Sequence, residues 1–347
     1  MSNPGQIRIP SKETSLRINT LRFLLVIAIV VIHARGYNEH FGGEQLGPAK
    51  LGSAAGFLQE LFSGVIARTA VPLFFLISGY LTATSLHRYS YAVFLRKRVR
   101  TLLIPYLLWN ALVFALSCAV DPSRFADANP LQVLGVTSLP ASYQFWFVRD
   151  LIILVALAPA CILAARIAAI PTVLCAAALW FVAPHWLGAN GAPIDPAAIC
   201  FFQVGVTLYL LPITFSPLAI RLAAIVYVPL ALMDTLVPNA SVGGVEFHKA
   251  VLLVGIVAVW EAGGWLLRAK PLPRALTASA FFVFAAHEPL LSVLMKLSYY
   301  VLRPGSDLTV TAIYVLAVAI TIVSCVIANW LFSKLMPRTH AIVTGGR

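Results

Sequence analysis

The stretch LRFLLVIAIVVIHA, residues 21–34, decides the fold class. Ten uncharged, apolar residues separate Arg22 from His33, and the surrounding apolar segment extends over residues 16–34. A run of this length, about 20 residues, is typical of a helix that crosses a bilayer. Nine more such segments follow: 65–86, 102–120, 145–165, 168–187, 197–211, 217–237, 249–268, 278–297 and 310–335. The sequence therefore predicts an all-α polytopic integral membrane protein with about ten transmembrane helices.

The composition supports this class and excludes others. Of the 347 residues, 60% are hydrophobic and 11% are charged, whereas soluble proteins average roughly 45–50% and about 25%. The mean hydropathy is +0.88. A soluble globule, a disordered chain and a disulfide scaffold are excluded, because too few polar residues are present to cover a water-facing surface. We expect one membrane-embedded domain, 1–347, with an N-terminal arm (1–15) and a C-terminal tail (336–347).

The charge pattern predicts the orientation. The chain has 25 Lys and Arg against 13 Asp and Glu, for a net charge of +12. In a soluble protein this excess would suggest nucleic acid, but here the cations gather in the N-terminal arm, in alternate connections and at the C-terminus. That distribution is the positive-inside pattern, so both termini are predicted to be cytoplasmic, with membrane lipids and not nucleic acid as the surroundings.

Two ionisable residues of the first span share one helix face. Eleven residues at 100° each make about 1100°, three turns plus about 20°, so Arg22 and His33 line up about 16 Å apart along the axis. Inside a membrane, Arg must find water or an anion, whereas a neutral His can be buried and still accept a proton. The alternative is that each side chain reaches its nearest membrane interface.

A series of further motifs follows in a fixed order. The second span contains VPLFFLISGYL (71–81), and RKRVRTLLIPY (96–106), FWFVRDL (145–151) and SAFFVFAAHEP (279–289) come after it. Together with Leu-Arg, ten residues and His, this series resembles the membrane-bound acyltransferase type 3 family over nearly the whole chain. The resemblance implies an enzyme of the bacterial inner membrane that moves an acyl group, usually acetyl, from cytoplasmic acyl-CoA to a sugar hydroxyl on the outer side.

The resemblance also assigns residues. His33 matches the family's essential histidine, Arg22 the arginine before it, and Arg98 with Arg100 the basic motif at the inner end of the third helix. The cluster of cations suits acyl-CoA, whose diphosphate and 3′-phosphate need guanidinium or ammonium partners. We therefore expect it to bind the donor, acetyl-CoA, without a metal; ordinary anchoring of the topology is the alternative. The cluster consists of Arg96, Lys97, Arg98 and Arg100.

Polar residues in later spans are candidates for the acceptor site. Trp146 could pack on a sugar ring while Arg149 and Asp150 bond its hydroxyls, although an aromatic belt with a structural ion pair explains them equally well. Three more ionisable residues lie inside apolar spans: Glu261, His287 and Glu288. The carboxylates of Glu261 and Glu288 are hypothesised to pair with Arg22 or to orient His33, or else to bond neighbouring helices.

The resulting prediction is an O-acetyltransferase acting on a hydroxyl of exopolysaccharide, lipopolysaccharide or another extracytoplasmic or lipid-linked carbohydrate. His33 would deprotonate the acceptor hydroxyl or carry the acetyl group transiently, and Arg22 would stabilise an oxyanion or a CoA phosphate. Two rivals remain. One is a transporter or flippase with a buried His/Arg/Glu pathway, and the other is a lipid-linked glycosyltransferase.

Overall fold

The computed structural model describes residues 11–35, 53–125, 129–135, 140–182, 194–211, 216–237, 243–269 and 271–346. Those residues form helices and short connections, and no strand occurs among them. Eight of the described helices are long and apolar enough to cross a membrane, and an apolar ninth, Pro196–Leu210, is shorter. The prediction of an all-α polytopic membrane protein is confirmed.

Two compact units make up the chain. We call the first the His33 unit, which is formed by Lys12–Val71 and Phe215–Leu335. The second, the Arg98 unit, is formed mainly by Pro72–Thr214 and Met336–Arg347. The predicted single domain thus contains two packing units, and each is described by itself below.

The His33 unit contains five long helices and the short segments that open the second predicted span. They are α1 (Lys12–Arg35), α2 (Ala54–Gln59), π-helical η2 (Glu60–Ile66), 3₁₀-helical η3 (Ala67–Thr69), α11 (Pro217–Leu236), α12 (Gly244–Ala269), α13 (Arg274–Leu302) and α14 (Asp307–Leu335).

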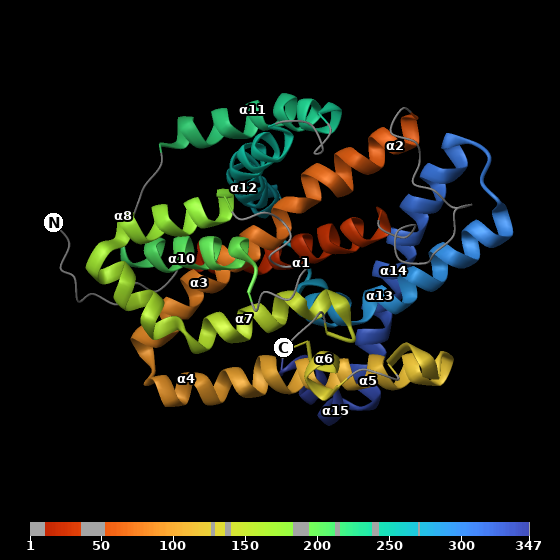
Figure 1. Ribbon diagram of the computed structural model, residues 1–347, viewed down its shortest axis with the longest axis horizontal. Coiled ribbons are helices and arrows are strands. Elements are labelled where there is room, and N and C mark those ends of the chain that lie inside the picture. Colours follow the sequence, from red (N-terminus) through yellow and green to blue (C-terminus); the bar gives the residue numbers. More distant parts are fainter. Residues whose placement is uncertain are drawn as a thin grey trace. The chain divides into compact units, whose positions relative to one another are not determined.

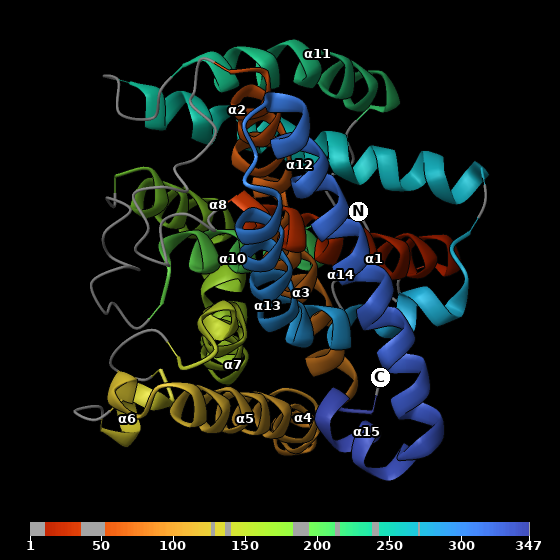
Figure 2. The ribbon, with the colours of Figure 1, turned by 90° about the vertical axis from the view of Figure 1, so that its right-hand side faces the viewer.

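Helix α1 is central in this unit. It packs against α12, α13, α14 and η2, while α11 pairs with α12 and α13 pairs with α14 (Figures 1 and 2). Small residues allow the close approach of α1 to α12: an added Cβ at Gly263 would meet Leu21, and one at Gly264 would meet Arg17. Association through small residues is expected in lipid, where burying apolar surface gives no driving force.

The Arg98 unit contains most of the second predicted span, the third to sixth spans and the C-terminal tail. Its elements are α3 (Ala70–Arg88, from Pro72 onward), α4 (Tyr91–Arg98), π-helical η4 (Val99–Leu103), α5 (Ile104–Val120), η5 (Pro122–Phe125), α6 (Pro130–Val133), η6 (Tyr143–Phe145), α7 (Trp146–Ala156), α8 (Ala158–Val182), α10 (Pro196–Leu210) and α15 (Pro337–Thr344).

A pair of glycines brings α3 and α10 into backbone contact. A Cβ added at Gly79 would overlap the carbonyl oxygen of Phe202, and one added at Gly205 would overlap that of Leu76. Any larger residue at either position must therefore push the two helices apart. This contact explains why glycine stands in the motif FFLISGYL.

The second and third spans are longer than predicted. Helical structure runs from Ala54 to Arg88 and from Tyr91 to Val120, so only Tyr89 and Ser90 separate the two. The basic cluster was predicted to lie in a connection but lies in a helix, in keeping with the good helix propensity of Arg and Lys.

The helices of the fourth and fifth predicted spans are interrupted at two places, each followed closely by a proline. Helix α7 ends before Leu157, and α8 has a non-helical residue at Ala168 (φ −148°, ψ 67°). Pro159 and Pro171 each follow a break closely, and neither can donate an amide hydrogen to the preceding turn. The predicted boundary between residues 165 and 168 thus coincides with the bend in α8.

The predicted C-terminal tail is partly helical. Helix α15 packs on α5, where the indole Nε1 of Trp109 donates to the carbonyl oxygen of Val343 at 3.1 Å. The tail is therefore part of the Arg98 unit, and the N-terminal arm is described only from residue 11.

Candidate active site

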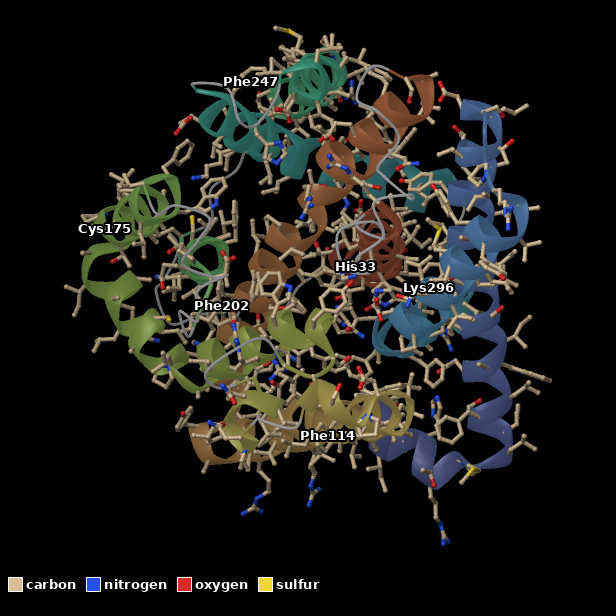
Figure 3. All side chains as sticks on the ribbon, turned by 45° about the vertical axis from the view of Figure 1, so that its right-hand side comes forward. His33, Phe114, Cys175, Phe202, Phe247 and Lys296 are labelled. Carbon is tan, nitrogen blue, oxygen red and sulfur yellow. The ribbon has the colours of Figure 1, made fainter. Side chains whose placement is uncertain are left out.

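His33 lies in the last turn of α1, against α13. Its ring centroid is 5.1 Å from that of His287, and the two rings meet edge to face at 86°. His33 is half-buried, whereas His287 is fully buried. Figure 3 shows His33 on α1, with Lys296 marking the neighbouring α13. The structure thus brings together two of the predicted site residues, from the first and ninth spans.

Hydrogen bonding fixes the tautomer of His287. Its Nδ1 lies 2.7 Å from the carbonyl oxygen of Phe284, one turn earlier in α13. A carbonyl only accepts, so Nδ1 carries the hydrogen and Nε2 presents a lone pair. That Nε2 is buried and has no hydrogen-bond partner among the described residues. A buried polar atom left open in this way calls for an explanation.

Arg22 is exposed and makes no hydrogen bond or ion pair with any described residue of its unit. The hypothesis that Glu261 or Glu288 pairs with it is wrong for the described contacts. Glu261 lies 4.0 Å from Arg17 and 3.4 Å from Arg268.

Glu288 accepts a hydrogen bond from the Ser292 hydroxyl at 2.7 Å, one turn along α13. The second hypothesis, that a carboxylate orients His33, stays a prediction, and the described ring neighbour of His33 is His287.

The basic cluster lies in the Arg98 unit, at the end of α4 and in η4. Arg96, Lys97 and Arg100 are exposed, and Arg98 is half-buried. Arg98 lies over the ring of Phe94, with 5.0 Å between its guanidinium carbon and the ring centroid. Lys97 places its ammonium 3.5 Å from the centroid of the Tyr89 ring. Aromatic rings therefore contact the charged ends of two of the four cations, and three of the four side chains are exposed.

The Arg149–Asp150 pair is a structural link. Asp150 is fully buried; one carboxylate oxygen accepts from Arg149 Nε at 2.9 Å, and the other accepts from the backbone amide of Asp195 at 2.8 Å. Arg149 also donates to the carbonyl oxygen of Gly135 at 2.9 Å. Asp150 is fully buried with both oxygens bonded, whereas Trp146 is only half-buried.

No group of three or more His, Cys, Asp or Glu residues in the described ranges could hold a metal ion. The sites that the structure does form are an imidazole pair in the His33 unit and a cationic surface in the Arg98 unit.

The chain is similar to known proteins over most of its length. The model of a family described as "Acyltransferase domain" matches residues 15–330, which cover most of both units. This chain belongs to the acyltransferase type 3 family. It is 26% identical, over 96% of its length and 93% of the relative's, to the succinoglycan biosynthesis protein ExoH of Rhizobium meliloti (strain 1021). No solved structure gives a significant match.

Two hydroxyl groups that the sequence motifs do not indicate bond to each other beside the last turns of α1. The Ser63 hydroxyl donates to the carbonyl oxygen of Val31 at 2.6 Å, so the Tyr314 hydroxyl must donate to Ser63 Oγ, also at 2.6 Å. The Tyr314 oxygen keeps its accepting capacity. Ser and Tyr inside apolar runs carry no charge, so no sequence signal distinguishes them from packing residues.

An ion pair closes the same end of α1 in the acyltransferase. Arg35 binds Glu60 through its two terminal guanidinium nitrogens, of which Nη1 lies 3.1 Å from Glu60 Oε1. Glu60 opens the π-helical segment η2, a form that occurs often at functional sites. Ionisable residues just beyond a predicted span were the available signal for this pair.

A histidine of α12, which the sequence motifs do not include, pairs with a carboxylate. His248 of α12 lies 2.6 Å from buried Asp234 of α11, Nδ1 to Oδ2. An acid in the last turn of one apolar helix and a histidine at the start of the next were the available signals.

Proposed function

We propose that this protein is an O-acetyltransferase of the bacterial inner membrane. It takes acetyl from cytoplasmic acetyl-CoA and esterifies a hydroxyl of an extracytoplasmic or lipid-linked carbohydrate. The family supports acyl transfer, and the relative's name, which refers to succinoglycan biosynthesis, supports a glycan acceptor. The observation that carries the proposal is the His33–His287 pair, an accessible imidazole backed by a buried one with an open nitrogen.

The transfer step uses one imidazole as base and acid in turn. A neutral ring nitrogen of His33 takes the proton of the acceptor hydroxyl as its oxygen attacks the thioester carbonyl. The carbon–sulfur bond then breaks, and the proton on His33 goes to the leaving CoA thiolate. The products are the O-acetyl ester and free CoA, so atoms and charge balance without a metal or redox partner.

Neighbouring groups assist this base. The open Nε2 of His287 faces no described partner, so it offers a lone pair beside the ring that becomes positive during the step. Arg22, eleven residues earlier and about 16 Å away along α1, is too far from His33 to contact the same oxyanion and is assigned to a phosphate of the donor. Burial of His287 strengthens its electrostatic effect on His33, because water does not screen it.

The donor and acceptor are assigned to opposite sides. The basic cluster supplies cations for CoA phosphates on the side that the charge pattern makes cytoplasmic. His33 lies in the last turn of α1, at the end of that helix that the charge pattern predicts to face away from the cytoplasm, where the acceptor would arrive. Trp146 is the stronger candidate for contact with the sugar, because it is half-buried whereas Asp150 is fully buried.

The test is replacement of His33. In membranes supplied with acetyl-CoA and, separately, succinyl-CoA, His33→Ala should lower transfer to glycan by about 10²–10⁴-fold, the usual loss with a general base. Protein abundance should stay near wild type. His340→Ala, in α15, is the matched control and should retain transfer.

Retention of more than about a tenth of wild-type transfer by His33→Ala would remove His33 as the base. A transporter or glycosyltransferase, in contrast, would produce no acylated glycan with either CoA ester, even as wild type. The identity of the accepted ester decides between acetyl and a longer acyl group.

A further inference from the structure

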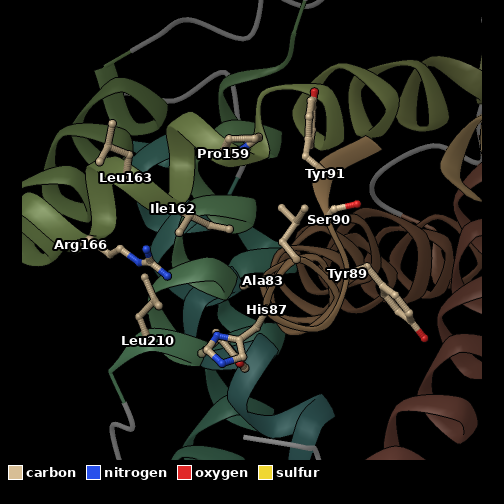
Figure 4. A pocket seen from close by; sticks show the side chains of 12 residues that line it. Ala83, His87, Tyr89, Ser90, Tyr91, Pro159, Ile162, Leu163, Arg166 and Leu210 are labelled. Atoms are coloured by element: carbon tan, nitrogen blue, oxygen red, sulfur yellow. The ribbon is translucent and has the colours of Figure 1, made fainter. Parts of the chain in front are cut away.

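The Arg98 unit contains a cavity of about 480 Å³ that the proposed transfer step does not use. Its walls come from the end of α3, the start of α4, the first half of α8 and the end of α10 (Figure 4). This volume lies in the range of small-molecule sites, about 300–1,000 Å³.

The described walls of this cavity carry a guanidinium and an imidazole but no carboxylate. Arg166 of α8 and His87 of α3 both line it, and no Asp or Glu occurs among the described lining residues. Arg166 makes no hydrogen bond or ion pair with any described residue. In Figure 4 the guanidinium of Arg166 and the ring of His87 both lie at the cavity. An unpaired guanidinium in a cavity without carboxylates favours an anionic ligand, and its planar fork matches phosphate.

Aromatic side chains form the other part of the wall. Tyr89, Tyr91 and Tyr209 line the cavity, and the first two are 44% and 40% exposed. Tyr91 is held by a hydrogen bond from its hydroxyl to the carbonyl oxygen of Ala156, and Tyr209 by ring contacts with His87. Exposed phenol rings offer stacking surfaces for a base, an interaction of about 1–3 kcal/mol per base.

The cavity adjoins the basic cluster. Lys97, one of its four cations, lies 3.5 Å from the ring centroid of Tyr89, which lines the cavity. A ligand that filled the cavity could therefore extend onto the cluster through this contact.

The topology places this cavity on the donor side. The sequence predicts that the second, fourth and sixth spans all end in the cytoplasm, and residues at those three ends, such as His87, Arg166 and Leu210, line one cavity. Three ends of one predicted side thus meet in the structure of a single unit.

We propose that this cavity binds the phosphorylated nucleoside end of the CoA donor. The purine lies against Tyr89, the 3′-phosphate binds Arg166, and the diphosphate reaches the basic cluster. This assignment rests on the proposed function, because it presumes a CoA ester as donor. A phosphate group on a lipid headgroup shares the anionic chemistry, but it has no ring for the tyrosines.

The test compares two ligands that differ by one phosphate. Purified protein in nanodiscs of phosphatidylcholine is titrated with CoA and with dephospho-CoA, which lacks the 3′-phosphate. Arg166→Ala should weaken CoA binding about ten- to hundredfold and change dephospho-CoA binding by less than about twofold. Arg166→Lys should fall between, because a point charge replaces the fork.

Arg221→Ala is the matched control, an exposed cation on the predicted cytoplasmic side of α11, and it should bind both ligands as wild type does. Equal losses for both ligands in Arg166→Ala, or no loss, would overturn the cavity assignment. Phosphatidylglycerol in the nanodiscs should leave CoA affinity unchanged; competition that depends on Arg166 would assign the cavity to a lipid headgroup instead. Failure of wild type to bind CoA at all would overturn the proposed donor, a different result from a wild type that binds CoA with no role for Arg166.

Discussion

Two buried polar pairs of this protein differ in how completely they are bonded. Arg149 and Asp150 bond each other and two backbone groups, and Asp150 is fully buried, so both of its oxygens are engaged inside the protein. His287, buried beside His33, leaves one ring nitrogen without a described partner. Complete bonding favours a role in holding helices, whereas an open position is available for proton chemistry. The sequence motifs contain both pairs and do not distinguish them.

The largest expected effect breaks the bonded pair. Asp150→Ala leaves the Arg149 guanidinium, 11% exposed, without its carboxylate and should lower the free energy of unfolding by about 3–5 kcal/mol. Denaturant unfolding in detergent measures this loss. Asp150→Asn, which keeps an accepting oxygen, should lose less. Transfer per folded molecule should change little in either variant, and a stable Asp150→Ala protein without activity would make Asp150 a ligand-binding residue after all.

A smaller effect is expected at the open pair. His287→Gln keeps a polar side chain of similar length but removes the imidazole beside His33, so kcat should fall about tenfold, the worth of one hydrogen bond. Affinity for CoA and abundance should stay near wild type, which a merely structural role would not produce. Glu288→Gln, on the adjacent position of α13, is the control. An unchanged kcat in His287→Gln would show that the His287 imidazole does not assist His33.

The smallest effect is expected at Glu261, which lies between Arg17 and partly exposed Arg268. Both contacts of the Glu261 carboxylate are long, 4.0 Å to Arg17 and 3.4 Å to Arg268, and Gln keeps an oxygen that accepts hydrogen bonds. Glu261→Gln should therefore change thermal stability by less than about 1 kcal/mol and transfer by less than about twofold. Thermal unfolding and the glycan assay check both values. A tenfold loss of transfer would return Glu261 to the catalytic candidates.

The sequence predicted the helices better than their ends. Apolar length alone locates each span, because a bilayer demands it. The early start at Tyr91 was missed because the added turns carry Arg and Lys and so resemble a connection, although these side chains form helices readily. Breaks in the fourth and fifth spans could be anticipated from Pro159 and Pro171.

The sequence offered candidate residues for the site but did not indicate which of them meet. His33 and His287 stand out as ionisable groups in apolar runs, yet their contact depends on how α1 packs against α13. One hypothesis paired Glu261 with Arg22, but the described contact of Glu261 on α1 is with Arg17. Five residues rotate a helix by about 140°, so the two arginines point to different neighbours, and only the packing of α12 selects one.

The contact of Gly79 with α10 has a consequence for the cavity described above. His87 follows Gly79 by eight residues, about 12 Å along α3, and Tyr209 follows Gly205 by four residues, about 6 Å along α10. The touching backbones therefore act as a spacer that sets the width of the opening above them. A single methyl group at Gly79 would work as a wedge, widening the mouth without altering any side chain that lines it. Selection for a donor of one size would then act on a glycine that never touches the donor.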